Sequence, residues 1–383
     1  MRLIYTLLAG FWCLFSLPAT SQTIALNGKT VSTAALAQRL NHIIDSANVT
    51  GLQVAIINKD RCVWTGSFGL KDTEKQLKLD DSTEMYAASL TKVVSAYLFL
   101  RLADKGIFSL DKPIHYYLKN PIGQYPKWKD LADDTLSFNK ITPRMLLSHI
   151  SGLPVLRALY GNKVSLIAKP GEKFYYSNEG LNLLGFMIEE YTGKGLEVLA
   201  KEQVFTPLHM DHTSMIWEPA FENNFSNAYY KDGKKYGSER RESSRAAGSM
   251  TTTADDYAKF VVNLMTRRGL SKKLYDQMFS PQIRVQSQRG FGPLRDSLTT
   301  GNDGIALSWG LGVGLFRSPY GPALFHTGHG DANENYFVAF ADKGIAVVLL
   351  SNSENFESAA SLILDACIAD HYSPLVWLGY FGN

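Results

Sequence analysis

The stretch YAASLTKVVSAYLFLRLADKG, residues 86–106, has a serine three residues before a lysine at the head of an apolar segment. If Ser89 and Lys92 lie on a helix, they share one face, with Cβ atoms about 5–6 Å apart. The lysine amine then comes within hydrogen-bonding reach of the serine hydroxyl. Free N–H groups in a first helical turn also favour negative charge nearby. The stretch predicts a nucleophile and its proton acceptor at the start of a helix, and the alternative interpretation is two polar residues that share a turn.

Two other Ser-x-x-Lys pairs lie in different contexts. Ser109–Lys112 directly precedes Pro113, which biases the lysine away from helix. Ser137–Lys140 lies in the polar stretch TLSFNKITP, just before a proline, where we expect a loop. Only Ser89–Lys92 leads into a long apolar segment, so it is the catalytic candidate.

A tyrosine motif follows at Tyr176-Ser177-Asn178, directly before a helix expected to begin near Glu179. A tyrosine aimed at the serine–lysine pair can relay protons if the nearby cation lowers its pKa. The amide of Asn178 can orient a substrate carbonyl. The alternative interpretation is a helix N-cap with a packed aromatic residue before it.

A third motif, His326-Thr327-Gly328, ends a predicted strand. Glycine there permits close backbone approach to a ligand. We expect edge-strand backbone groups to bind the substrate, and the N–H of His329 to form an oxyanion hole with the N–H of Ser89. The alternative is a β-turn with a surface histidine.

In this order the motifs resemble the serine β-lactamase and penicillin-binding protein superfamily, on the branch of class C β-lactamases, D-Ala-D-Ala carboxypeptidases and related esterases. Two further segments resemble that branch, LLSHISGLP at 146–154 and AAGSMTTTADDYAKF at 246–260. The similarity runs from about residue 35 to residue 370.

The resemblance implies a role for each matched residue. Ser89 attacks a carbonyl and forms an acyl-enzyme, while Lys92 and Tyr176 share the general-base and general-acid steps. Asn178, His326, Thr327, Gly328 and His329 would bind the substrate. His149 is interpreted as a structural loop residue, and the family mechanism implies no metal or organic cofactor.

We expect an α+β fold, an antiparallel β-sheet flanked by helices with a large, mainly helical insertion. Strand-like runs near both ends of the chain predict a discontinuous sheet domain, residues 22–88 and 251–383. The mainly helical domain would span 89–250. Cys62 and Cys367 each lie in an apolar segment, so they form either one disulfide or two buried thiols.

Residues 1–21 have the positive start, apolar run and small residues of a cleaved signal peptide, which predicts a periplasmic or secreted protein. The alternative, a membrane anchor, is disfavoured because the apolar run is short for a span of about 20 residues. The net charge of +3, with no extended basic run, disfavours a nucleic-acid partner.

The predicted function is therefore a secreted serine hydrolase acting on a small-molecule or peptide acyl substrate. A D-amino-acid peptidase, carboxypeptidase or esterase leads, because His326 stands where class C β-lactamases usually have lysine. Histidine is only partly charged near neutral pH. A true β-lactamase and a non-turnover penicillin-binding sensor are the alternatives, and the oligomeric state stays open.

Overall fold

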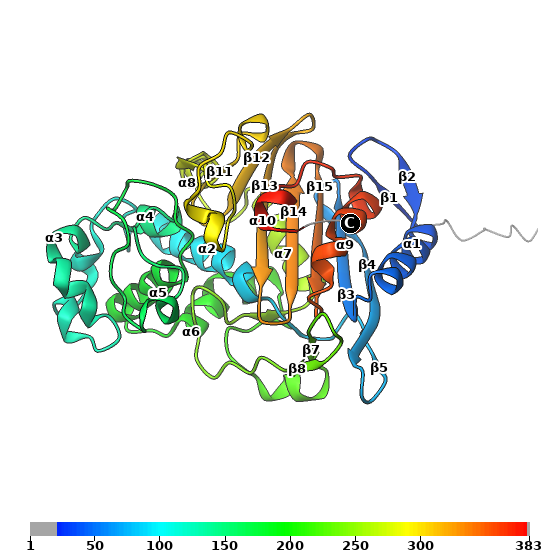
Figure 1. The fold of residues 1–383 in the computed structure, drawn as a ribbon, viewed down its shortest axis with the longest axis horizontal. Helices are drawn as coiled ribbons and strands as arrows, with labels where there is room; N and C mark the ends of the chain where they lie inside the picture. Colours follow the sequence, from blue (N-terminus) through cyan, green and yellow to red (C-terminus); the bar gives the residue numbers. More distant parts are fainter. Residues whose placement is uncertain (1–20, 381–383) are drawn as a thin grey trace, which may run out of the picture.

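The computed structural model describes residues 21–380, and Figure 1 shows a central sheet with helices on both faces and a helical region at one end. The sheet has nine strands in the order β10-β11-β12-β13-β14-β15-β3-β4-β5. Every neighbouring pair is antiparallel. Its strands are β3 (Gly51–Asn58), β4 (Arg61–Asp72), β5 (Leu77–Lys78), β10 (Ile283–Arg284), β11 (Ser308–Trp309), β12 (Gly314–Ser318), β13 (Gly321–His329), β14 (Glu334–Phe340) and β15 (Ile345–Ser351).

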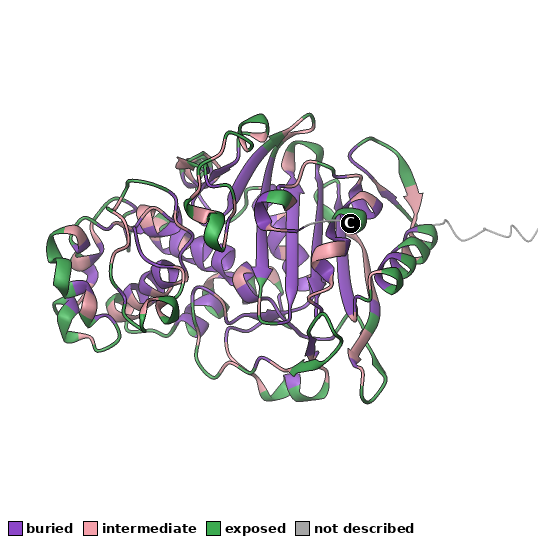
Figure 2. Cartoon of the chain, viewed as in Figure 1, coloured by how far each residue is buried: buried purple, intermediate pink, exposed green. Residues whose placement is uncertain are grey.

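Three central strands, β3, β14 and β15, are buried along their whole length (Figure 2). Their side chains alternate between two hydrophobic cores, as in Leu52 and Val54 on one face of β3 and Ala55 on the other. This burial on both faces explains why the strands read as continuous apolar runs.

Helices cover the two faces of the sheet. The helices α1 (Thr33–Ser46) and α9 (Phe356–Ile368) pack into one core, and α7 (Ala254–Met265) packs into the other. Helix α1 begins after an N-cap at Ser32, whose Oγ accepts the Ala35 N–H at 3.2 Å. The α+β fold with an antiparallel sheet flanked by helices is confirmed.

The inserted region consists of helices, 3-10 turns and loops, and less than half of residues 89–250 are helical, so the expectation of a mainly helical insertion holds only for part of it. Its helices are α2 (Thr91–Asp104), α3 (Thr135–Phe138), α4 (Pro143–Leu147), α5 (Asn178–Thr192) and α6 (Leu196–Ala200), and α6 continues into a π-helical turn. Every residue of α2 from Thr91 to Leu100 is buried, which is typical of a helix enclosed on all sides. Ser137 lies in α3, so the loop expected there is wrong.

The remaining elements are short. They are the strand pairs β1 (Gln22–Ile24) with β2 (Thr30–Ser32), β6 (Met85–Tyr86) with β9 (Thr251–Thr252), and β7 (Ala228–Tyr229) with β8 (Lys235–Gly237), and the helices α8 (Lys272–Met278) and α10 (Leu375–Leu378). The strands β11 and β12 follow each other closely in the sequence. The chain turns between them at Gly312, where φ is +78° and an added Cβ would lie 2.2 Å from the Ala96 Cβ.

The sheet takes strands from both ends of the chain, β3 to β5 before residue 88 and β10 to β15 after residue 251. The division into two domains at these residues stays a prediction. Cys62 and Cys367 are free thiols, and they belong to different hydrophobic cores, so they do not pair.

The predicted signal peptide lies outside the described residues, apart from its last residue. Within residues 21–380, no helix has the length and apolar character that crossing a bilayer requires.

Candidate active site

Ser89 lies in a 3-10 turn, Ala88–Leu90, that leads directly into α2. Its hydroxyl oxygen is 2.8 Å from the Nζ of Lys92, so the predicted pair is formed, with the serine in the turn and the lysine in the helix. Ala88 has a φ of +47°, a left-handed conformation that is uncommon for a residue with a Cβ. Such sharp turns cluster at functional sites, and this one presents the serine at the end of a buried helix.

Lys92 is completely buried, and its Nζ also donates to the carbonyl oxygen of Ala247 at 2.6 Å. Burial alone lowers the pKa of Lys92 well below its ordinary value, because the charged form loses its hydration. A lysine whose neutral form is favoured in this way can accept the proton of the adjacent serine hydroxyl.

Tyr176 stands beside the same pair, with the Lys92 Nζ 4.9 Å from the centre of its ring. Burial raises the pKa of Tyr176, and the Ser89 hydroxyl opposes only part of that rise. The expectation that a nearby cation lowers this pKa is wrong, because the phenol is buried and Lys92 itself favours its neutral form. Tyr176 is therefore a protonated phenol at neutral pH, suited to donating a proton.

The residues after Tyr176 form the helix cap that the sequence offered as an alternative. Ser177 Oγ accepts the Gly180 N–H at 2.8 Å and donates to the Pro154 carbonyl at 2.7 Å. Asn178, the first residue of α5, lines the cavity, and within the described chain its buried Oδ1 has no hydrogen-bond partner. The catalytic and the helix-cap interpretations of this segment are therefore compatible, since the cap at Ser177 fixes the positions of Tyr176 and Asn178.

Strand β13 carries the third motif. It lies inside the sheet, but its pairing with β12 ends at Phe325, and the last four residues pair with β14. The edge of β13 that faces away from β14 is therefore open only over these last four residues, next to the cavity. A Cβ on Gly328 would lie 2.4 Å from the Ala87 carbonyl oxygen, so glycine is what lets this strand approach the serine turn. Thr327 and His329, which alternate with it, line the cavity.

His326 does not have the expected surroundings. It is fully buried, lies outside the cavity lining, and packs its ring 5.4 Å from that of Trp309 and 6.1 Å from that of Tyr176. Burial, with a smaller effect from Lys92, lowers the pKa of His326 to about 3. The sequence offered two expectations for His326, a partly charged side chain at the substrate and a surface β-turn, and both are wrong. His326 is a neutral, buried residue that packs near Tyr176.

His149 supports the tyrosine from another side. Its φ is +58°, its Nδ1 accepts the Ser177 N–H at 3.1 Å, and its ring centre is 4.5 Å from that of Tyr176. Burial lowers the pKa of His149 well below its ordinary value. These contacts fit the structural role expected from the sequence.

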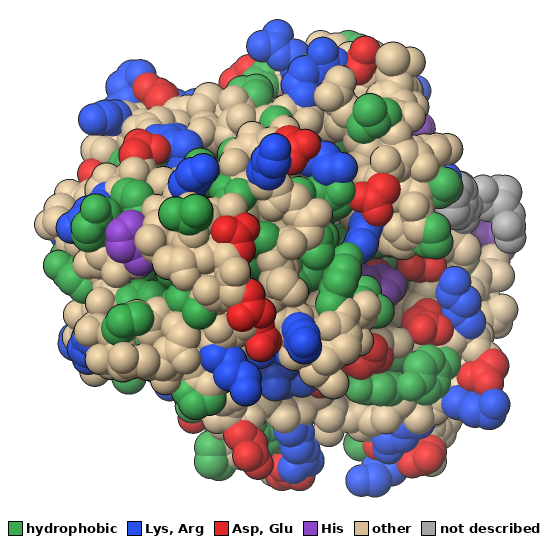
Figure 3. All heavy atoms as spheres, turned by 60° about the vertical axis from the view of Figure 1, so that its left-hand side comes forward, with side chains coloured by type: hydrophobic (Ala, Val, Ile, Leu, Met, Phe, Trp, Pro, Cys, Tyr) green, Lys and Arg blue, Asp and Glu red, His purple; other side chains and the backbone are tan. Residues whose placement is uncertain are grey.

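These residues surround a cavity of about 870 Å³. Sequence reasoning missed much of its wall, because those residues come from loops without a motif and from the end of the chain. The missed lining includes Leu156, Arg241, Arg245, Phe291, Arg295 and Tyr380. Figure 3 shows acidic, basic and hydrophobic side chains mixed on the face turned toward the viewer.

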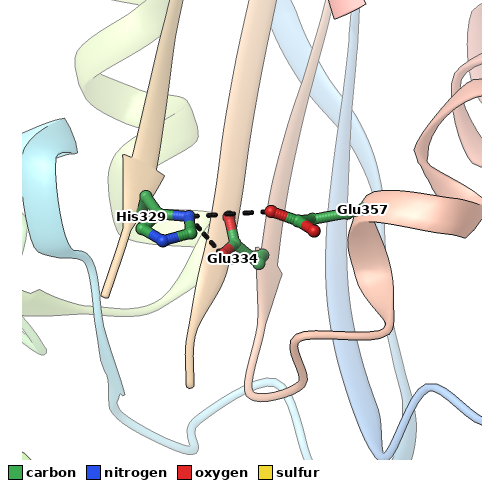
Figure 4. Close-up of side chains that lie close together, drawn as sticks. All are labelled: His329, Glu334 and Glu357. Atoms are coloured by element: carbon green, nitrogen blue, oxygen red, sulfur yellow. Dashed lines mark ion pairs between the residues drawn. The ribbon is translucent and has the colours of Figure 1, made fainter. Parts of the chain in front are cut away.

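One group at the cavity has the side chains of a metal site. The ligand atoms of His329, Glu334 and Glu357 lie within 4.8 Å of one another (Figure 4). Their charges are already balanced, because His329 forms an ion pair with Glu334, and Glu357 Oε2 lies 3.1 Å from the Nζ of Lys231. We therefore assign this group no metal.

Known sequences resemble the chain over part of their length. It is similar to Protein flp of Staphylococcus aureus (strain COL), 28% identical over 197 residues that cover 46% of this chain and 36% of that protein. It is also similar to Putative beta-lactamase-like 1 of Homo sapiens, 26% identical over 253 residues that cover 60% of this chain and 48% of that protein. The chain thus spans less than half the length of these curated relatives.

Solved structures share the fold. The octameric penicillin-binding protein homologue from Pyrococcus abyssi matches with a TM-score of 0.71 and 21% identity, over 88% of this chain and 76% of that chain. The D-alanine carboxypeptidase AmpC from Burkholderia cenocepacia matches with a TM-score of 0.68 and 17% identity, over 87% of this chain and 98% of that chain.

The family model described as Beta-lactamase matches residues 36–367. That match covers most of the chain and includes the Ser89–Lys92 pair, Tyr176 and the His326-Thr327-Gly328 strand. The chain belongs to the beta-lactamase family, a fold family of serine hydrolases.

Proposed function

We propose that the chain is a secreted serine acyl-hydrolase that forms an acyl-enzyme on Ser89, with a D-amino-acid-containing peptide or a small ester as substrate. One observation carries the proposal. A buried lysine whose neutral form is favoured lies 2.8 Å from a serine hydroxyl that lines a cavity of about 870 Å³. Secretion rests on the signal-peptide pattern of residues 1–21.

The first step is acylation. Ser89 Oγ gives its proton to the Nζ of Lys92 and attacks the substrate carbonyl carbon, forming the Oγ–C bond. The negative charge on the carbonyl oxygen is stabilised by the N–H groups of Ser89 and His329. As the C–N or C–O bond of the substrate breaks, the leaving amine or alcohol takes a proton from Tyr176, which is protonated again from Lys92.

Water then releases the acyl group. The water gives one proton to the lysine–tyrosine pair and attacks the acyl carbon. The Oγ–C bond breaks, Ser89 recovers its hydrogen, and a carboxylic acid leaves. An alcohol or amine that takes the place of water would make the same site an acyltransferase.

The charge at the strand bears on the choice of substrate. His326 is neutral, so the position usually held by lysine in class C β-lactamases offers no cation to a substrate carboxylate. This favours an ester or a peptide bound through uncharged groups.

A β-lactamase is the second candidate, and Arg245 favours both it and a carboxypeptidase among the leading activities. The Arg245 side chain is exposed in the cavity lining and has no hydrogen bond or ion pair with any residue of 21–380. Arg241 and Arg295, which also line the cavity, are instead paired with Glu239 and Asp296. Arg245 is therefore available to bind a substrate carboxylate.

The test compares the mature chain with two alanine variants of Ser-x-x-Lys serines. Ser89→Ala removes the nucleophile, and Ser137→Ala is the matched control. Each protein is given p-nitrophenyl butyrate, a D-Ala-D-Ala peptide and a chromogenic cephalosporin, and its mass is measured intact. We expect turnover that Ser89→Ala abolishes and Ser137→Ala leaves unchanged. A stable adduct without turnover would identify a sensor, and turnover by Ser89→Ala would overturn the proposal.

A further inference from the structure

The end of the described chain contributes a buried tyrosine to the active site. Helix α10 ends at Leu378, and the next residue, Gly379, has a φ of +90° that reverses the chain and directs Tyr380 back toward the sheet. The Tyr380 N–H donates to the Leu375 carbonyl at 2.9 Å, which fixes this turn. The side chain is 4% exposed, and its ring packs edge-on against Phe356 with centres 6.3 Å apart.

The Tyr380 hydroxyl joins two buried residues of neighbouring strands. It lies 2.6 Å from Thr327 Oγ1 on β13 and donates to Glu334 Oε2 on β14 at 2.9 Å. The Thr327 hydroxyl also lies 3.2 Å from the Asn335 carbonyl oxygen, to which it donates. Because Tyr380 gives its one proton to the carboxylate, its oxygen is left as an acceptor, and the single proton of Thr327 is shared between the Tyr380 oxygen and the Asn335 carbonyl.

Glu334 extends this chain of contacts to His329. Figure 4 shows the His329 imidazole and the Glu334 and Glu357 carboxylates pointing toward one another from the end of β13, the start of β14 and the start of α9. His329 forms an ion pair with Glu334, and its Nδ1 lies 3.8 Å from Glu357 Oε1. Glu334 is completely buried, whereas the His329 side chain is 56% exposed and lines the cavity.

Thr327 and His329 face the cavity from alternate positions of one strand, and we call these two side chains the strand wall. We propose that Tyr380 and Glu334 are positioning residues for the strand wall, which they hold in one chain of hydrogen bonds and ion pairs so that an acyl substrate can bind against it. The inference rests on the proposed function, since the molecule that binds the strand wall is taken to be the acyl substrate of Ser89.

Two groups of this network, Glu334 and His329, have raised pKa values. Burial raises the pKa of Glu334 to about 7, and the contact with Glu334 raises the pKa of His329. The other charged groups that act on His329 are Glu354 and Glu357, and Glu357 is held by Lys231. The ion pair is therefore lost as pH rises through the raised pKa of His329 and as pH falls through the raised pKa of Glu334, and in either case the wall loses its fixed geometry.

Three variants test the proposal. Tyr380→Phe removes one hydroxyl and keeps the ring, and Glu334→Gln keeps the shape but removes the charge. Tyr336→Phe is the matched control, because Tyr336 is also a fully buried tyrosine, its hydroxyl donates to Ser373 in the C-terminal segment at 2.8 Å, and it lies outside the cavity lining. Melting temperature, the KM and kcat for p-nitrophenyl butyrate from pH 5 to 9, and labelling of Ser89 by an alkyl fluorophosphonate are measured for each.

We expect Tyr380→Phe and Glu334→Gln to raise KM roughly tenfold, the loss of one hydrogen bond to a charged group, with a smaller change in kcat. In Glu334→Gln the rise of KM with pH moves to lower pH, because His329 loses the partner that raises its pKa. NMR titration of His329 in the same variant shows the same direction. Tyr336→Phe loses stability but keeps its KM and pH profile.

An unchanged KM and pH profile in both variants, with Ser89 still labelled, would overturn the inference and leave the proposed function intact. The inference is also overturned if Tyr336→Phe raises KM as much as Tyr380→Phe. If Tyr380→Phe does not fold, Glu334→Gln decides through its pH profile and the His329 titration. Absence of fluorophosphonate labelling at Ser89 in the unaltered chain would instead refute the proposed function.

Discussion

A methyl group at residue 328 is expected to disable the active site without touching a catalytic side chain. In Gly328→Ala, the new Cβ would lie 2.4 Å from the Ala87 carbonyl oxygen and 3.0 Å from two side-chain atoms of Asn335. Contact at an ordinary distance requires β13 and the serine turn to separate by about 1 Å. A displacement of this size at a reacting centre costs roughly 10²-fold in rate.

The separation also costs stability. Overpacking a well-packed site costs about 1–3 kcal/mol, which calorimetry detects as a lower melting temperature. The rate is measured as kcat/KM for p-nitrophenyl butyrate at a temperature where both proteins are folded. Gly304→Ala is the control, because no heavy atom lies within 4 Å of its added Cβ and its φ is outside the left-handed region.

The two variants are compared directly. We expect Gly328→Ala to lose about two orders of magnitude in kcat/KM, and Gly304→Ala to keep its activity and melting temperature. A Gly328→Ala protein with unaltered kcat/KM and stability would refute the close approach of β13 to Ser89.

Three further predictions concern charge at the site. Lys92→Met should lower kcat for p-nitrophenyl butyrate by roughly 10²–10⁴-fold, the usual contribution of a general base, and a smaller loss would assign the base elsewhere. The pKa of His326 is lowered to about 3, so below pH 6.5 this histidine binds a proton in the unfolded chain but not in the folded chain. Stability should therefore fall by about 2–3 kcal/mol between pH 7 and pH 4.5 in urea unfolding, and less steeply in His326→Gln. Arg245→Ala should weaken binding of the cephalosporin and the D-Ala-D-Ala peptide while leaving the KM of p-nitrophenyl butyrate unchanged; an equal loss for all three would show that Arg245 does not bind a carboxylate.

Sequence spacing predicted the parts of the site that depend on local geometry. Ser89 and Lys92 are three residues apart across the start of a helix, so their contact follows from the backbone. The N-cap of α1 is local in the same way, since Ser32 Oγ accepts a hydrogen bond from the N–H of Ala35, three residues on. The apolar runs of β3, β14 and β15 followed from burial on both faces of a sheet.

The protonation states of the site depend on tertiary burial and could not be predicted from spacing. His326 and Tyr176 were expected to respond to nearby charge, but both are enclosed, and burial dominates their pKa values. Tyr380 was missed because its contact with Thr327 depends on a chain reversal at Gly379, 52 residues after the Thr-Gly pair begins at Thr327. No motif marks such a contact in one sequence.

The central claim is that Ser89 is the nucleophile, and mapping one covalent adduct tests it most directly. The protein is treated with an alkyl fluorophosphonate, which forms a phosphorus–oxygen bond to an activated serine and releases fluoride, and the modified peptide is sequenced by mass spectrometry. We predict a single adduct on Ser89 that is lost in Ser89→Ala and in Lys92→Met. An adduct on another serine, or equal labelling of Ser89→Ala, would contradict the account.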